Sequence, residues 1–248
     1  MNSTRYHPLL ACDIASSAGR GATGLQNIRE ALRSALSAAF AAAGLTLADC
    51  PFLDTGDGFS VVTPADLPKA GLLHPLLPEL AQRIHEHNRQ AQPGTQLAVR
   101  VALHAGEIHV AADGSVSGPP FEVLARLLDA DQLRRAVREV TSGAPVAAIL
   151  SQHFYEETVG HGYEGLDPDA FTRASVAVKA YSGEAWLWYP GSPIGPRLDS
   201  SSAGALSPTS EPSAPESAGP EQSNQASGRS MLFAVNAGDM HVRQTGRD

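Results

Sequence analysis

Two aspartates in this 248-residue sequence occupy positions from which they could bind divalent cations. Asp13 closes an apolar segment, and Asp57 lies in a short turn between Gly56 and Gly58. Paired carboxylates at loop ends are the ligands that Mg²⁺ or Mn²⁺ needs when it bridges a polyphosphate. Aspartate is also one of the commonest residues in turns and at strand ends, where it needs no metal. The two positions therefore allow either a metal site or ordinary turn chemistry.

Strand and helix patterns around the two aspartates predict how they are positioned. Residues 6–14 form an apolar run that predicts a buried strand, and a Gly- and Ser-rich loop follows it. Residues 25–44 carry apolar side chains at every third or fourth position, which predicts an amphipathic helix. Residues 51–54 and 58–63 flank the turn and predict a β-hairpin with Asp57 at its tip.

The rest of the first 190 residues alternates predicted helices and strands. Apolar side chains recur at helical spacing in longer segments, whereas shorter runs of β-branched and aromatic residues predict strands. The predicted helices are 72–90, 121–140 and 152–159, and the predicted strands are 96–104, continued by 106–110, then 144–150, 175–179 and 185–189. Because hairpins are among the pairings, we expect a mixed sheet with helices packed on it, which is an α+β fold.

An abrupt change of composition after Tyr189 sets the expected domain boundaries. Residues 191–229 are mainly Ser, Pro, Ala, Gly and Glu, so they cannot bury enough surface to offset the entropy of ordering. Residues 230–248 regain apolar side chains in a pattern of two very short strands with a turn between them. We therefore expect a folded domain at 1–190, a disordered linker at 191–229, and a short motif at 230–248 that pairs with another chain or stays disordered.

Charge and hydropathy argue against several classes of partner. The net charge is -8 and there is no long run of Lys or Arg, so we expect neither a nucleic-acid nor an anionic-membrane surface. No apolar stretch approaches the roughly 20 residues of a membrane span. Cys12 and Cys50 lie in apolar segments and make no disulfide framework. Together these features predict a cytoplasmic protein.

Five segments of the first 190 residues carry a family resemblance. In order and spacing they resemble the catalytic domains of class III nucleotide cyclases, the adenylyl and guanylyl cyclases. They are CDI at 12–14, DTGDG at 54–58, RVALHAGEIH at 100–109, GPPFEVLARLLDA at 118–130 and VAVKAYSGEAWLWY at 176–189. The resemblance implies a ferredoxin-like βαββαβ core with a mixed, mainly antiparallel sheet. It also implies a head-to-tail homodimer with catalytic sites in the interface.

The resemblance assigns roles to five residues. It implies that Asp13 and Asp57 hold two Mg²⁺ or Mn²⁺ ions, and that the backbone carbonyl of Ile14 assists one of them. Arg126 matches the arginine that stabilises charge on the phosphate in the transition state. Lys179 matches the lysine that binds the end of the triphosphate.

Three positions depart from the family pattern. Glu122 stands where the family has an asparagine that orients the ribose, and its negative charge would repel a triphosphate. Leu53 and Ser115 stand at the two base-selecting positions, where they reproduce neither the adenine pair nor the guanine pair. The sequence therefore does not predict which base is used.

Two functions follow from the resemblance and its departures. The first is a signalling cyclase that converts a nucleoside triphosphate to a 3′,5′-cyclic nucleotide and pyrophosphate. The alternative is a catalytically inactive cyclase-homology module that acts as a nucleotide-binding or dimerising adaptor. The aspartates, Arg126 and Lys179 favour the enzyme, whereas Glu122, Leu53 and Ser115 favour the adaptor.

The motif at 230–248 also has a resemblance of its own. It is similar to short C-terminal amyloid signalling motifs, which some bacterial immunity and cell-death effectors use to template on a matching partner. Short strands interrupted by Asn, Gln and Gly have the composition that stacks into cross-β assemblies. The competing interpretation is a frayed terminus without a partner.

Overall fold

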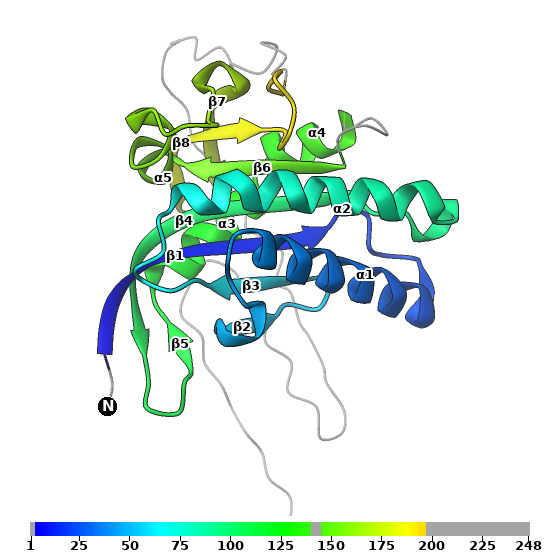
Figure 1. Ribbon diagram of the computed structural model, residues 1–248, viewed down its shortest axis with the longest axis horizontal. Helices are drawn as coiled ribbons and strands as arrows, with labels where there is room; N and C mark the ends of the chain where they lie inside the picture. Colours follow the sequence, from blue (N-terminus) through cyan, green and yellow to red (C-terminus); the bar gives the residue numbers. More distant parts are fainter. Residues whose placement is uncertain (1–2, 140–144, 197–248) are drawn as a thin grey trace, which may run out of the picture. The chain divides into compact units, whose positions relative to one another are not determined.

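The structure, a computed structural model that describes residues 3–139 and 145–196, is organised around one mixed β-sheet (Figure 1). Its strands follow the order β2-β3-β1-β4-β6-β8-β7, and β5 pairs with β4. Neighbouring strands run antiparallel except β4 and β6, which are parallel. The strands are β1 (Ser3–Ile14), β2 (Phe52–Asp54), β3 (Gly58–Val62), β4 (Val99–Val110), β5 (Val116–Ser117), β6 (Val146–Ser151), β7 (Phe171–Val178) and β8 (Tyr181–Trp188).

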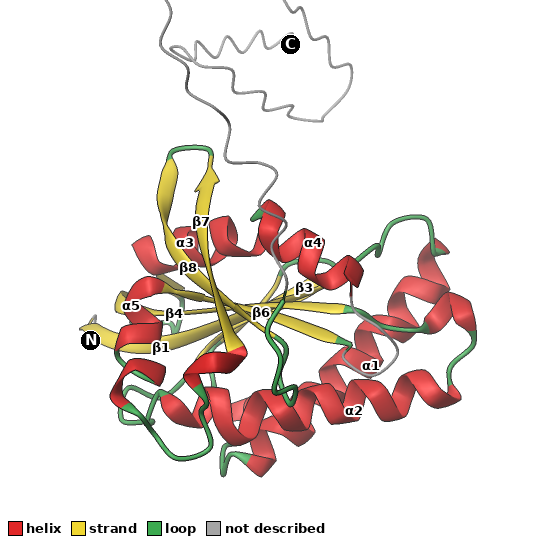
Figure 2. Ribbon diagram, turned by 90° about the horizontal axis from the view of Figure 1, so that it is seen from above, coloured by secondary structure: helices red, strands yellow, loops and turns green. Residues whose placement is uncertain are grey.

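Helices cover both faces of the sheet (Figure 2). Helices α1 and α2 pack on one face, and α3 and α4 pack on the other. The α-helices are α1 (Gly21–Ala42), α2 (Leu77–Gln90), α3 (Pro119–Leu128), α4 (Asp131–Glu139) and α5 (Gln152–Glu156). Shorter helical turns are η1 (Leu47–Asp49), η2 (Leu72–Leu76), η3 (Pro93–Thr95), η4 (Val159–His161) and η5 (Pro168–Ala170). The α+β fold class and the mainly antiparallel sheet expected from the sequence are confirmed.

Strand β1 is the central strand that carries the first aspartate. Alternate side chains along it serve the two helical layers, because successive residues of a strand point to opposite faces of the sheet. Leu10 and Ile14 belong to the core beneath α1 and α2, whereas Leu9 and Ala11 belong to the core beneath α3 and α4. The same alternation places Asp13 on the face that α3 and α4 cover.

The predicted helix at 121–140 is wrong in one respect, because the chain forms two helices there. Helix α3 ends at Leu128 and α4 begins at Asp131. Ala130 is fully buried at the break, and the backbone N–H of Arg134 donates to its carbonyl at 3.0 Å. Leu127 and Leu133 are fully buried on either side, so the apolar spacing continues across the break and conceals it from periodicity.

Some sequence expectations concern the ends of the folded region. The described residues end at 196, so the predicted linker from 197 onward and the motif at 230–248 lie outside them, and the domain limits stay predictions. Within residues 3–139 and 145–196, no helix combines the length and apolar character needed to cross a membrane. Cys12 and Cys50 are free thiols and are buried.

Candidate active site

Asp13 and Asp57 meet at the end of two neighbouring strands. Strands β1 and β3 pair antiparallel with Asp13 opposite Gly58, and the backbone N–H of Ile14 donates to the carbonyl of Asp57 at 3.1 Å. Both aspartates line one cavity of about 540 Å³, which we call the active-site cavity. The structure therefore brings the two carboxylates to the same face of the sheet.

Two glycines allow the turn to bring Asp57 this close to β1. A Cβ atom on Gly58 would lie 2.0 Å from the carbonyl oxygen of Cys12, so only glycine fits there without a shift of the backbone. Gly56 has a φ of +96°, which other residues rarely adopt. The carboxylate of Asp54 accepts a hydrogen bond from the Gly56 N–H at 2.9 Å and fixes the turn further.

A bidentate ion pair holds the Asp13 carboxylate. Arg100 Nε donates to Oδ1 and Arg100 Nη2 donates to Oδ2, each at 2.7 Å, and both side chains are only 15% exposed. Burial raises the pKa of Asp13 to about 6; the charge and hydrogen bonds of Arg100 oppose this rise, whereas Asp57 and Asp129 add to it. Asp13 is therefore ionised at neutral pH but fully engaged by the guanidinium.

Asp57 has a different environment from Asp13. The Ser17 hydroxyl, from the loop after β1, donates to Asp57 Oδ2 at 3.0 Å. Among the described residues, Asp57 makes no ion pair with a Lys, Arg or His side chain. Its negative charge is therefore directed into the active-site cavity without a neutralising partner.

Sequence analysis missed Asp129, which is the third carboxylate of this cavity. Asp129 follows the last residue of α3 and accepts a hydrogen bond from Arg134 at 2.9 Å. Phe121, Ala125 and Leu128 form an apolar wall on the same helix. In the sequence, Asp129 is only a carboxylate one position beyond the apolar stripe of an amphipathic helix. Such residues are too common to indicate a functional site.

The remaining predicted positions near the cavity divide into two groups. Leu53 lines the cavity, as do Val116 and Ser117 of β5. Ser115 instead lies in the β4–β5 turn, where its N–H and hydroxyl both donate to Asp113 Oδ1. The Ile14 side chain is buried in the core, so only its backbone faces the aspartates.

Arg126, Glu122 and Lys179 do not line the active-site cavity of their own chain. Arg126 Nη2 donates to Glu122 Oε1 at 3.0 Å, one turn away on α3. Arg126 Nε is buried and has no hydrogen-bond partner among the described residues. Lys179 has a φ of +54° in the turn of the β7–β8 hairpin, which projects from the sheet (Figure 2). One chain thus gathers the carboxylates but not the two predicted cations.

The donor set suits a hard divalent cation with few protein ligands. Mg²⁺ is commonly bound through one or two carboxylates, with water and substrate phosphate completing its coordination. Asp13 and Asp57 supply two such carboxylates on one cavity wall. No group of three or more His, Cys, Asp or Glu side chains in the described residues is arranged to hold a metal alone. Both oxygens of Asp13 are engaged by Arg100, so metal binding requires at least one of these hydrogen bonds to open.

Comparison with known proteins identifies solved structures that have the same fold. No protein-family model and no curated protein matches the sequence. Among solved structures, an adenylate/guanylate cyclase/hydrolase from Silicibacter pomeroyi is 21% identical, with a TM-score of 0.55 over 77% of this chain and 99% of that one. The guanylyl cyclase Cya2 is 16% identical, with a TM-score of 0.51 over 80% of this chain and 99% of that one. A bacterial light-regulated adenylyl cyclase is 11% identical, with a TM-score of 0.52 over 75% of this chain and 52% of that one. The chain therefore has the fold of adenylyl and guanylyl cyclase catalytic domains.

Proposed function

We propose that this protein is a nucleotide cyclase, which converts a nucleoside triphosphate to a 3′,5′-cyclic nucleotide and pyrophosphate. The observation that carries the proposal is the meeting of Asp13 and Asp57 in one cavity, at the ends of paired strands of a cyclase-type sheet. The cavity of about 540 Å³ lies within the range of small-molecule sites.

Asp13 and Asp57 are the residues that would hold the divalent cations. Mg²⁺ or Mn²⁺ bound there would activate the ribose 3′-hydroxyl and neutralise the triphosphate. The apolar wall of Phe121, Ala125 and Leu128 would contact the nucleoside, with Leu53 on the hairpin side. None of these apolar side chains distinguishes bases through hydrogen bonds, which agrees with the absence of the family's base-selecting pairs.

A second copy of the chain would complete the site. Arg126 and Lys179 lie outside the active-site cavity of their own chain, and Lys179 stands in the turn of a projecting hairpin (Figure 2). Lys179 makes no ion pair with any described residue. In a head-to-tail homodimer these cations would enter the partner's cavity and stabilise the phosphate charge that one chain leaves exposed.

Product formation from purified protein tests the proposal. The full chain is incubated with Mn²⁺ and each of ATP, GTP, CTP and UTP, and cyclic product is separated by chromatography. We expect product from at least one nucleotide, and its loss in Asp57→Asn. Asp66→Asn is the matched control, because Asp66 is exposed and does not line the cavity. Absence of product from all four nucleotides at high protein concentration would contradict the enzyme.

The alternative function is an inactive module that binds nucleotide or dimerises as an adaptor. Two observations favour it. Arg100 donates hydrogen bonds to both carboxylate oxygens of Asp13, and Glu122 accepts a hydrogen bond from Arg126, the residue expected to stabilise the phosphate charge. Equilibrium dialysis with labelled nucleotide separates the two functions. Binding without turnover supports the adaptor, whereas binding with cyclic product supports the enzyme.

The motif at 230–248 lies outside the described residues, and its self-association is a separate proposal. If it templates on a matching partner, clustering would raise the effective concentration of the attached domains and promote their dimerisation. A synthetic peptide of residues 231–248 should form thioflavin-positive fibrils. A peptide that stays monomeric at millimolar concentration would count against this role.

A further inference from the structure

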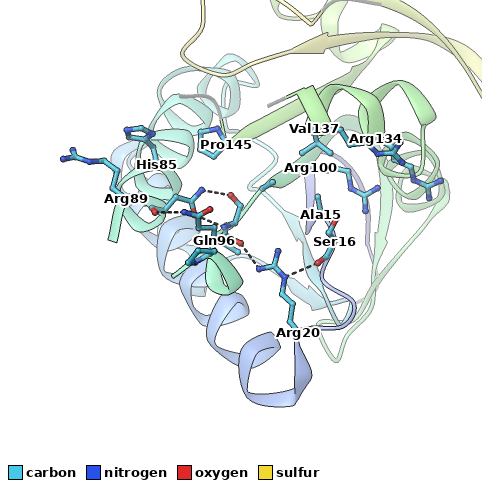
Figure 3. A pocket seen from close by; sticks show the side chains of 15 residues that line it. Ala15, Ser16, Arg20, His85, Arg89, Gln96, Arg100, Arg134, Val137 and Pro145 are labelled. Atoms are coloured by element: carbon cyan, nitrogen blue, oxygen red, sulfur yellow. Dashed lines mark hydrogen bonds between the residues drawn. The ribbon is translucent and has the colours of Figure 1, made fainter. Parts of the chain in front are cut away.

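A second and larger cavity, of about 980 Å³, lies where β1 ends and where β4 and β6 begin (Figure 3). Its wall includes the loop after β1, the C-terminal half of α2, the segment before β4, and α4. The charged side chains that line it are all basic: Arg20, Arg89, Arg100, Arg134 and Arg138, with His85 beside them. None of its described lining residues is acidic, although the chain carries a net charge of -8. We call it the basic cavity.

Three of these arginines form no ion pair with any residue that the structure describes. Arg20 donates to the backbone carbonyls of Ser16 at 3.0 Å and Gln96 at 2.7 Å (Figure 3), and to that of Gly94 at 3.2 Å. These hydrogen bonds fix the guanidinium but do not neutralise its positive charge. Arg89 and Arg138 make no ion pair with any described residue. Like charges gathered at one cavity repel one another, and a bound anion would relieve that repulsion.

The other two arginines separate the basic cavity from the active-site cavity. Arg100 lines the basic cavity, and its partner Asp13, at 2.7 Å, lines the active-site cavity. Arg134 also lines the basic cavity and pairs with Asp129 of the active-site cavity at 2.9 Å, and more loosely with Asp131 at 3.8 Å. In each of these two ion pairs, the arginine lines the basic cavity and the aspartate lines the active-site cavity.

We propose that the basic cavity binds a small molecule that carries a phosphate group, and that this binding draws Arg100 and Arg134 away from Asp13 and Asp129. Guanidinium groups bind phosphate in the same forked geometry as carboxylate, so phosphate competes directly for them. The volume of about 980 Å³ accommodates a ligand of nucleotide size. Binding here would free the Asp13 carboxylate for a divalent cation, and this consequence alone rests on the proposed function.

Calorimetric titration of the full chain with inorganic phosphate, at constant ionic strength set with NaCl, tests the site. We expect saturable binding that Arg138→Gln weakens about fivefold, because one favourable charge interaction is lost. Arg135→Gln is the matched control, since Arg135 lies on the same helix, is exposed and does not line the cavity. Absence of saturable binding, or equal weakening by both variants, would overturn the site.

The coupling between the cavities has its own test, which requires neither metal nor turnover. Asp13→Asn should strengthen phosphate binding about fivefold, because Arg100 no longer has a carboxylate partner. Asp57→Asn removes the same charge from the same cavity but has no arginine partner, so it should change phosphate binding much less. If the two variants changed the phosphate affinity equally, the change would come from the lost negative charge alone. That result would overturn the coupling through Arg100.

A second variant and a separate cyclase assay distinguish failure of the anion site from failure of the proposed enzyme. If Asp13→Asn does not fold, Asp129→Asn tests the same coupling through the more exposed pair with Arg134, with a smaller effect because Arg134 keeps Asp131 at 3.8 Å. The cyclase assay is read separately. A chain that shows the expected phosphate pattern but forms no cyclic nucleotide would retain the basic cavity as an anion site and lose the proposed enzyme.

Discussion

Arg100 and Asp13 join β4 to β1 through two parallel hydrogen bonds of 2.7 Å each. The Cα atoms of the two residues are also register partners across the β1–β4 ladder. The pair therefore fixes the carboxylate that is the candidate metal ligand, and it does so from a neighbouring strand rather than from a mobile loop. A site built on such rigid elements holds its side chains in place before any ligand arrives.

Arg100→Met should destabilise the fold by about 2 to 4 kcal/mol, because it leaves the Asp13 carboxylate buried without a partner. Urea unfolding followed by circular dichroism measures the loss. The double variant Asp13→Asn/Arg100→Met should recover much of it, since no charge remains buried. A single variant as stable as the parent chain would show that the ion pair does not stabilise the fold.

Gly58→Ala should destabilise the fold by about 2 kcal/mol or more, because its Cβ would lie 2.0 Å from the Cys12 carbonyl oxygen. The same shift would displace Asp57 and lower any metal affinity. Gly94→Ala is the control, since a Cβ there meets no atom within 4 Å. Thermal unfolding of the two variants should differ clearly, and similar melting temperatures would contradict the close approach of the strands.

Mixing two inactive variants tests the proposed dimer. Asp57→Asn lacks a metal ligand and Lys179→Ala lacks the triphosphate cation, so each alone should be inactive. In a mixed dimer one of the two interface sites keeps both residues, so an equal mixture should recover about a quarter of the parent activity. A mixture that stays inactive, while each variant still dimerises in analytical ultracentrifugation, would place Lys179 outside the partner's site.

The stability of the fold should fall on mild acidification because of His104. Burial, together with the charge of His153 and against that of Glu157, lowers the pKa of His104 to about 4. Its Nδ1 lies 2.8 Å from the Ser151 hydroxyl. Between about pH 6.5 and pH 4 the unfolded chain binds a proton that the folded chain excludes, so stability is lost as the pH falls through this window.

The loss attributable to His104 should be about 2 to 3 kcal/mol between pH 7 and pH 4. The raised pKa of Asp13 acts in the opposite direction over part of this range, so the comparison uses variants. His104→Gln should flatten the pH dependence of urea midpoints relative to the parent chain. The exposed His109→Gln should leave it unchanged, and a parallel response of the two variants would contradict the assignment.

Periodicity predicted most of the fold, and its failures have physical causes. The apolar run in β1 indicates a strand buried on both faces, and the helical spacing in α1 indicates one buried face, so the sequence predicted both elements. The break between α3 and α4 escaped notice because Leu127 and Leu133 keep their spacing across it. The break depends on how Ala130 packs against the rest of the fold. The sequence of a single segment does not contain that information.

Only those residues of the candidate site that have a local sequence signal could be predicted. Glycines on both sides of Asp57 marked the turn, and the strand end marked Asp13. The contact between Arg100 and Asp13 joins residues 87 positions apart in sequence, and the place of Asp129 at the cavity depends on how α3 packs on the sheet. No spacing rule connects residues so far apart, so these contacts required the structure.

The strict alternation of β1 makes the location of the chemistry depend on strand phase. Deleting one residue ahead of Asp13 would turn this carboxylate into the apolar layer beneath α1 and α2, and would turn the side chain of Ile14 to the cavity face in its place. The sheet could absorb that slip only by burying an ion among leucines, which costs far more free energy than turning an isoleucine toward the cavity. The register of this strand therefore determines both the packing of the fold and the chemistry of the cavity, although only one of its twelve residues, Asp13, carries the candidate metal-binding carboxylate.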